Sequence, residues 1–146
     1  SMASWKKVGC VSAVVLCGLL VGGAWFVNHK IDAVIRNAYA VWWVADMIIV
    51  YMEDNDNAWP QGWDDLHKPY EKLVERSRRA WTFEELRARV EVDWDADPSV
   101  LADASPVEGE PPFRVIWLRD GTSSHWSGRE PNRMILDHLL AENATE

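Results

Sequence analysis

The sequence predicts an α+β protein: a long N-terminal helix, half membrane-spanning and half soluble, packs on a small antiparallel sheet, and short helices follow, including a C-terminal one. Three observations predict this class. Residues 8–27 form an uncharged apolar run, and residues 24–59 contain neither glycine nor proline and place apolar side chains at helical spacing. Residues 89–95 alternate strictly between apolar and charged side chains, as in a half-buried strand. A chain of 146 residues therefore holds one domain with an attachment segment.

The composition excludes several classes of protein. With 48% hydrophobic and 26% charged residues, the chain is too apolar for intrinsic disorder, and two cysteines are too few for a disulfide-stapled scaffold. All 23 acidic residues lie from Asp32 onward. Such an acidic chain is repelled by a phosphate backbone, so we expect no nucleic-acid partner. Ten tryptophans are the one gross anomaly of the composition.

The apolar run has the length of a membrane span. At about 1.5 Å per residue a helix of this length covers roughly 30 Å, the thickness of the hydrocarbon core of a bilayer. A cleavable secretory signal is the competing interpretation, but its apolar core usually has only about 7 to 15 residues. Lys6 and Lys7 precede the run and favour a cytoplasmic N-terminus. We therefore expect residues 1–7 in the cytoplasm, with Ser1 as a cloning remnant, residues 8–27 in the membrane and in contact with lipid, and residues 28–146 outside the cytoplasm.

Two pairs of small residues lie within the run. Gly18 and Gly22 form a Gly-x-x-x-Gly pair, which lets two membrane helices approach closely and is a candidate surface for self-association. Cys10 and Cys17 are seven residues apart on one face of the predicted helix, and we expect both to be free thiols.

We expect residues 31–52 to form one continuous helix whose Trp42, Ala45 and Ile49 are covered by the strands. The rival interpretation is a second membrane span at residues 38–52. This segment has only fifteen residues and carries Asp46 near its middle, which disfavours a span.

The region after this helix resembles a known family. A tyrosine, an Asp/Asn-rich break, an aromatic-Pro pair and a leucine follow one another at Tyr51, residues 54–57, Trp59-Pro60 and Leu66. Together with the basic start and the single apolar helix, this order resembles the type IV pilins and the type II secretion pseudopilins over roughly residues 6–66.

The resemblance implies a fold and a structural or assembly role more than an activity. Residues 6–9 are similar to the end of a pilin leader, whereas Val14 stands where the family has glutamate at the fifth mature position. In the fold that the resemblance implies, Pro60 ends the helix region and Trp59 folds back against the helix.

Shorter elements are predicted for the remainder. Thr82 and Glu85 have the spacing of a capping box at the start of a short helix. Asp120-Gly121 favours a turn. The other expected elements are a surface helix at residues 69–80, a loop at 96–112, strands at 113–118 and around 123–127, and a C-terminal helix at 131–142.

The tryptophans fall into three expected groups. Trp5 and Trp25 flank the span, where an aromatic belt is typical. Trp42, Trp43, Trp94 and Trp117 lie on periodic apolar faces, and we expect them in the core. Trp59, Trp63, Trp81 and Trp126 lie in loops or at element ends. Exposed indoles there would bind a protein or glycan partner, and Trp63, Trp81 and Trp126 are the candidates for this role.

Nothing in the sequence indicates an enzyme. The acidic run at residues 53–57 lacks the glycine of an EF-hand loop, and the four histidines have no metal-ligand spacing. Asp120, Ser123, Ser124 and His125 lack a nucleophile elbow. We expect no catalytic, cofactor or metal site. Two function classes remain: a membrane-anchored, pilin-like structural or assembly protein with a protein partner or homo-oligomer, and an anchored recognition domain that uses loop tryptophans.

Overall fold

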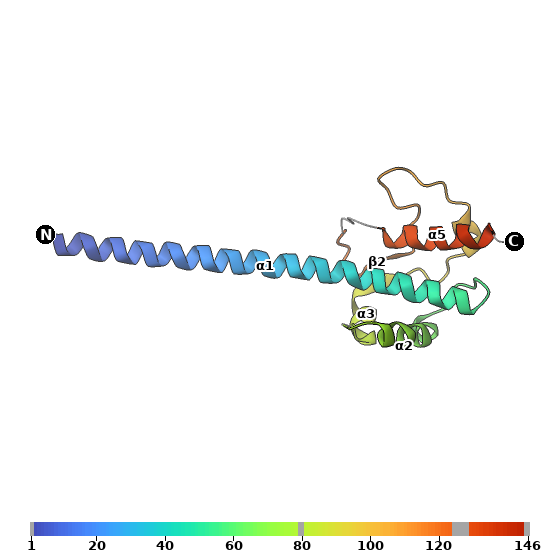
Figure 1. Cartoon of the computed structure of the whole chain (residues 1–146). Coiled ribbons are helices and arrows are strands. Elements are labelled where there is room, and N and C mark those ends of the chain that lie inside the picture. Colours follow the sequence, from blue (N-terminus) through green and yellow to red (C-terminus); the bar gives the residue numbers. More distant parts are fainter. Residues whose placement is uncertain (1, 79–80, 124–128, 145–146) are drawn as a thin grey trace. The chain divides into compact units, whose positions relative to one another are not determined.

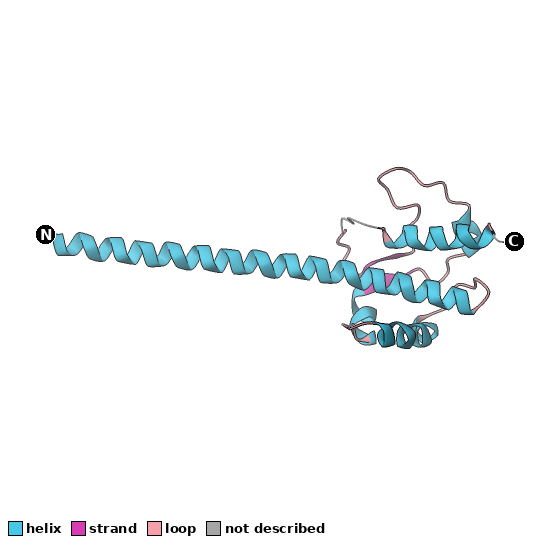
Figure 2. Cartoon of the chain, in the orientation of Figure 1, coloured by secondary structure: helices cyan, strands magenta, loops and turns pink. Residues whose placement is uncertain are grey.

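The computed structural model describes residues 2–78, 81–123 and 129–144, and side chains from Ala13 onward within these ranges. The chain divides into two units, Ser1–Arg36 and Asn37–Glu146. Helices dominate both, and the second unit also contains a two-stranded antiparallel sheet (Figure 2). The predicted α+β class, with a long N-terminal helix and a short C-terminal one, is confirmed.

Helix α1 runs without a break from Met2 to Asp54. The predicted continuous helix over residues 31–52 is therefore confirmed, and no reversal separates residues 28–36 into two spans. The helix stops in a turn in which Asp56 and Asn57 adopt positive φ angles of 53° and 59°. The backbone N–H of Asn57 closes this turn by donating to the carbonyl oxygen of Met52 at 2.9 Å. Asn and Asp tolerate this left-handed conformation, so the turn ends the helix several residues before Pro60.

The core of the second unit forms around the end of α1. In Figure 1, α5 lies on one side of this part of α1, and α2 and α3 lie on the other. Val44, Ala45 and Ile48 are completely buried, while Trp42 and Ile49 are half-buried against the same core. The expectation that the strands cover Trp42, Ala45 and Ile49 is met only in part. Val90, Ile116 and Leu118 belong to the same core as Ala45, but Trp42 and Ile49 remain half-buried.

Short helices follow α1 in the order expected. A 3-10 turn at Trp63–Leu66 leads into α2, His67–Arg76, and α3 covers Phe83–Arg89. The predicted capping box is confirmed: the Thr82 hydroxyl accepts from the Glu85 N–H at 3.2 Å, and the Glu85 carboxylate accepts from the Thr82 N–H at 3.0 Å. The C-terminal helix α5 spans Pro131–Asn143, close to the prediction.

One predicted loop contains a helix. Residues 96–112 include the five-residue helix α4, Pro98–Ala102, whose N-cap is Asp97. The Asp97 carboxylate accepts from the N–H of Ser99 at 2.9 Å and from its hydroxyl at 2.7 Å. Asp followed by Pro is a helix-start signal, because proline is favoured at the first helical position. The prediction of a loop without a helix overlooked this signal at Asp97-Pro98.

The sheet pairs β1, Val90–Val92, with β2, Ile116–Leu118, in antiparallel register with Val90 opposite Leu118. Both strands are shorter than predicted. The expected core position of Trp117 is wrong, because Ile116 and Leu118 point into the core and the residue between them points to the opposite face. The expected third strand falls mainly on residues 124–128, which lie outside the described ranges. Asp120-Gly121 forms the predicted turn, with φ 77° at Gly121.

The other three tryptophans expected in the core are only half-buried. Trp42, Trp43 and Trp94 pack against the core but remain partly exposed. Trp94 follows the end of β1, and the alternation of burial continues to it, because Asp93 and Asp95 on either side are exposed. An indole is large enough to cover the edge of a small core while part of the ring stays in water.

Candidate functional site

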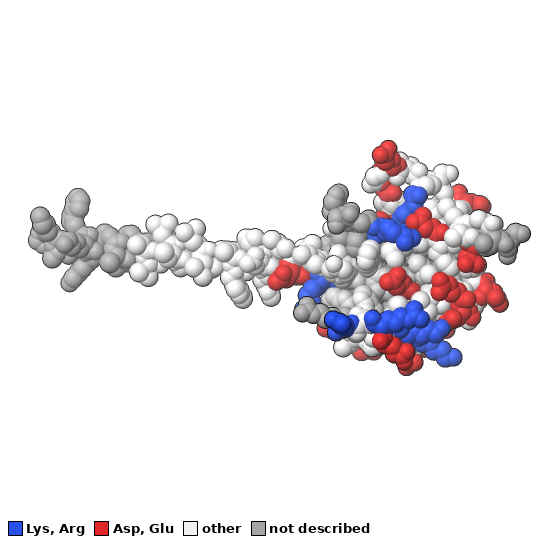
Figure 3. Space-filling model, in the orientation of Figure 1, with Lys and Arg blue, Asp and Glu red and all other residues white. Residues whose placement is uncertain are grey.

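The first candidate site is the apolar helix of the first unit. Every described residue of this unit from Ala13 to Arg36 is exposed, including Leu19 at 70% and Phe26 at 59%. Figure 3 shows a stretch of this helix without acidic or basic side chains, whereas charged groups gather over the second unit. Within the described residues, this helix is long and apolar enough to cross a membrane. A signal sequence near an N-terminus satisfies the same criterion.

Gly18 and Gly22 lie one turn apart on this helix. A Cβ atom built on either glycine would meet no atom within 4 Å, so nothing in the chain requires glycine there. The glycines therefore leave a flat strip of backbone, the surface that close helix packing uses. Trp25 is 68% exposed and stacks on His29 with ring centroids 5.5 Å apart. Trp5 and Cys10 have no described side chain, and Cys17 is a free, exposed cysteine.

Trp59 and Pro60 occupy a structural position. Trp59 is 4% exposed, and Pro60 is among the fully buried residues. The indole N–H of Trp59 donates to the backbone carbonyl oxygen of Asp93 at 2.9 Å, which ties the segment after α1 to the end of β1. The ring is buried and its N–H is hydrogen-bonded inside the domain. Trp59 therefore offers no surface to a ligand.

The three tryptophans expected to bind a partner have different environments. Trp81 is 9% exposed and belongs to the core, so the expectation that it is an exposed indole is wrong. The Arg89 guanidinium carbon lies 5.0 Å from the centroid of the Trp81 ring and covers it. Trp63 is half-buried and meets Phe83 and Trp94 edge-on, with centroids 5.7 and 5.6 Å away. Trp126 lies outside the described residues.

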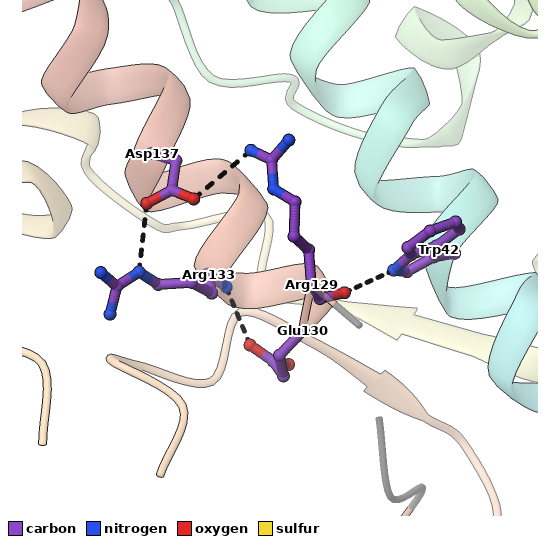
Figure 4. Close-up of polar contacts among 5 residues, drawn as sticks. All are labelled: Trp42, Arg129, Glu130, Arg133 and Asp137. Atoms are coloured by element: carbon purple, nitrogen blue, oxygen red, sulfur yellow. Dashed lines mark hydrogen bonds and ion pairs between the residues drawn. The ribbon is translucent and has the colours of Figure 1, made fainter. Parts of the chain in front are cut away.

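A polar network joins α1 to the start of α5 (Figure 4). The indole N–H of Trp42 donates to the carbonyl oxygen of Arg129 at 2.6 Å. The Arg129 guanidinium contacts Asp137 at 3.3 Å, and the same carboxylate pairs with Arg133 at 3.1 Å. The Glu130 carboxylate accepts from the backbone N–H of Arg133 at 2.8 Å and caps the helix. These contacts fix the orientation of α5 and have no arrangement typical of catalysis.

Asn132 is a buried polar residue whose role sequence reasoning missed. Its side-chain oxygen accepts from the N–H groups of Val115 and Ile116 at 2.8 and 3.1 Å, and its amide donates to the Ile116 carbonyl at 3.1 Å. The residue is 4% exposed. It thus holds β2 to the first turn of α5. An asparagine after proline in a helix gives no sequence signal for such a contact.

A shallow hollow of about 230 Å³ opens on the second unit. Its lining residues are Asn37, Ala88, Arg89, Leu118, Arg119 and Asp120. Arg119 pairs with Glu91 at 3.2 Å, and Arg89 donates to the Glu85 carbonyl oxygen at 3.2 Å. Both guanidinium groups thus contact other groups of the protein beside the hollow.

The described residues bring no candidate metal ligands together. Among the described residues, no group of three or more His, Cys, Asp or Glu side chains could hold a metal ion. His138 Nε2 instead lies 3.1 Å from Asn57 Oδ1 in the turn after α1. Ser124 and His125 fall outside the described ranges, so the geometry of that group is not defined.

Comparison with known proteins gives no family: no family model matches the chain, and neither does any curated protein or solved structure.

Proposed function

We propose that this protein is a single-pass, membrane-anchored and pilin-like structural or assembly protein, whose acidic domain acts through contacts with other proteins outside the cytoplasm. The observation that carries the proposal is the contrast in burial along α1. Residues 13–27 expose apolar side chains all round, whereas Val44, Ala45 and Ile48 are enclosed by the domain. An exposed all-round apolar helix is costly in water and is stable in a bilayer.

The buried side-chain polar atoms of the described residues all have hydrogen-bond partners within the protein. Trp59 and Trp81, two of the tryptophans near loops, pack in the core of the domain. These features favour a structural or assembly protein over a domain that captures a small ligand through exposed indoles.

The pilin-like character rests on the resemblance in residues 6–66 and on the helix-plus-sheet arrangement. In this proposal the single helix carries both the anchor and part of the core, and the turn at residues 55–57 directs the chain back toward the sheet. We expect the intact protein to form multimers or filaments that depend on its apolar helix.

The membrane part of the proposal can be tested by alkaline extraction. Membranes from cells that express the full chain are washed at high pH, which removes peripheral proteins, and the pellet is assayed. Leu20→Arg places a charge in the apolar run at a cost of about 2.5 to 3.5 kcal/mol near a membrane centre, so it should shift the protein to the soluble fraction.

Val100→Arg is the matched control. Val100 in α4 is 66% exposed and Leu20 is 68% exposed, so both substitutions add a charge to an exposed aliphatic position. The control should stay in the pellet like the unmodified chain. Complete release of the unmodified chain by alkali would contradict the anchor, and protection of the C-terminus from protease outside intact cells would contradict the orientation.

A further inference from the structure

Helix α2 carries a basic stripe in an otherwise acidic chain. Lys68, Lys72 and Arg76 follow one another at intervals of four residues, so they lie on one face of the helix, and all three are exposed. In Figure 3 basic side chains gather over the part of the second unit where α2 lies in Figure 1. Glu71 and Glu75 occupy the neighbouring strip of the helix. We call the three basic residues the 68–76 stripe.

The two ends of the 68–76 stripe have no acidic partner within the domain. Lys72, in the middle, forms an ion pair with Asp54 at the end of α1. In the part of the chain that the structure describes, neither Lys68 nor Arg76 forms an ion pair. Both side chains can therefore pair with carboxylates that another molecule supplies.

The complementary charge lies in the segment that contains α4 and leads to β2. Residues 91–113 include seven acidic residues and no basic one. Residues 103–112, here called the acidic loop, expose Glu108 and Glu110. At its tip the backbone N–H of Glu110 donates to the carbonyl oxygen of Val107 at 3.2 Å, and Gly109 has a φ angle of 84°. The acidic loop thus presents two carboxylates on a hydrogen-bonded turn.

The stripe and the acidic loop lie on opposite sides of the second unit. In Figure 1, α2 lies on one side of the end of α1, whereas the acidic loop extends beyond α5 on the other side. One copy therefore cannot close this contact on itself. Two copies joined through one stripe and one loop leave the second stripe and the second loop unoccupied, so the contact can repeat from copy to copy.

We propose that the 68–76 stripe binds the acidic loop of a second copy of this chain, so that copies join head to tail. This inference rests on the proposed assembly role and names the two surfaces that carry it. A second copy supplies carboxylates at the same concentration as the stripe, and confinement to one membrane raises the effective concentration of both. Opposite charges steer the copies together and fix which surfaces meet.

Carbodiimide cross-linking tests this contact in the full chain in membranes. The reagent converts an amine and a carboxylate that touch each other into an amide. The unmodified chain should therefore give a ladder of dimers and longer products. Mass spectrometry of the digested dimer should show Lys68 or Lys72 joined to Glu108 or Glu110.

Charge reversal on each surface is the decisive comparison. Lys68→Glu with Arg76→Glu, or Glu108→Lys with Glu110→Lys, should lower the yield of the ladder by about tenfold, because like charges then face each other. All four positions are exposed, so we expect an unchanged Tm. The four substitutions together restore opposite charges and the net charge of the unmodified chain. The ladder should then return to within about twofold of its original yield.

Co-expression of the two double variants provides a second test that does not need the fourfold variant to fold. Each variant alone carries two surfaces of like charge, whereas a mixture pairs each surface with its opposite, so the ladder should reappear with the two variants alternating. A ladder that neither double variant lowers would overturn the proposed contact. Failure of both the fourfold variant and the mixture to restore the ladder would overturn it too.

Two further outcomes separate this contact from the proposals on which it rests. A ladder lost only in the stripe variant would assign the stripe to another anion, such as a lipid surface, and would overturn the contact. Multimers that persist in every variant contradict this contact but leave the assembly role intact. Absence of multimers from the unmodified chain contradicts both, and release of that chain by alkali contradicts the anchor.

Discussion

The indole N–H of Trp59 donates a hydrogen bond to the backbone carbonyl oxygen of Asp93 over 2.9 Å. This contact joins the segment after α1 to the residue that follows β1, and the ring is 4% exposed. Trp59→Ala removes the hydrogen bond and leaves a large cavity. Truncation of a buried tryptophan costs about 3 to 5 kcal/mol, a large part of the roughly 5 to 15 kcal/mol that stabilises a small domain. Thermal unfolding of residues 28–146 should show loss of the folded state or a strongly lowered Tm.

Trp117→Ala is the control for this substitution. Trp117 is half-buried on the outer face of β2, where the Arg114 guanidinium lies 5.5 Å from its ring centroid. We expect a clearly smaller loss of stability than for Trp59→Ala. An unaltered Tm in Trp59→Ala, accompanied by loss of a binding activity, would favour the recognition domain over the structural role.

Asn132→Ala should destabilise the domain more than its size suggests. The substitution leaves the buried N–H groups of Val115 and Ile116 without an acceptor, and each unsatisfied group costs about 1 to 3 kcal/mol. Arg133→Ala, which changes the adjacent exposed residue, should cost much less. Urea unfolding of the two variants measures the difference, and equal midpoints would show that water replaces the amide at no cost.

Thr82→Ala should weaken the start of α3. The hydroxyl of Thr82 accepts from the Glu85 N–H at 3.2 Å. Replacement of a threonine N-cap by alanine costs about 0.5 to 2 kcal/mol. Thr82→Ser retains the hydroxyl and should remain close to the unmodified protein in urea unfolding. A loss as large in the serine variant as in the alanine variant would argue against the cap.

Asp97 should contribute to a loss of folding stability at acid pH. Hydrogen bonds from the Ser99 hydroxyl and the Ser99 N–H hold the pKa of the Asp97 carboxyl below its ordinary value. Because the folded-state pKa is the lower one, this contribution is present above an unfolded pKa of about 3.9 and is lost as the pH falls through the folded value.

The measurement for Asp97 is the unfolding midpoint as a function of pH. Asp97→Asn keeps an acceptor for the cap but does not titrate. Between about pH 5 and pH 2 it should therefore lose less stability than the unmodified protein. Parallel curves for the two proteins would contradict this role of Asp97.

Periodic features were predictable from the sequence. The length of α1, the capping box at Thr82 and the inward positions of Val90 and Val92 follow from local spacing and local hydrogen bonds. The burial of Trp81 and the outward position of Trp117 depend on how the elements assemble. The sequence around a tryptophan does not indicate which side of its element will be covered. The environments of Trp81 and Trp117 were therefore predicted wrongly.

The candidate site was predictable in part for the same reason. The uncharged run is a property of consecutive residues, so its length could be read from the sequence. The position of Trp59 beside Asp93 and the contacts of Asn132 with β2 join residues that are 34 and 16 or 17 apart in the chain. Such contacts arise only after the helix, the strands and α5 have packed.

The central claim is that residues 8–27 are retained as a membrane anchor. Its most direct test is the intact mass of the protein recovered from alkali-washed membranes of cells that express the full chain. The account predicts a membrane-bound protein whose mass includes residues 8–27. A protein that lacks these residues and is found in the soluble fraction would show that the run is a cleaved signal, and it would contradict the account.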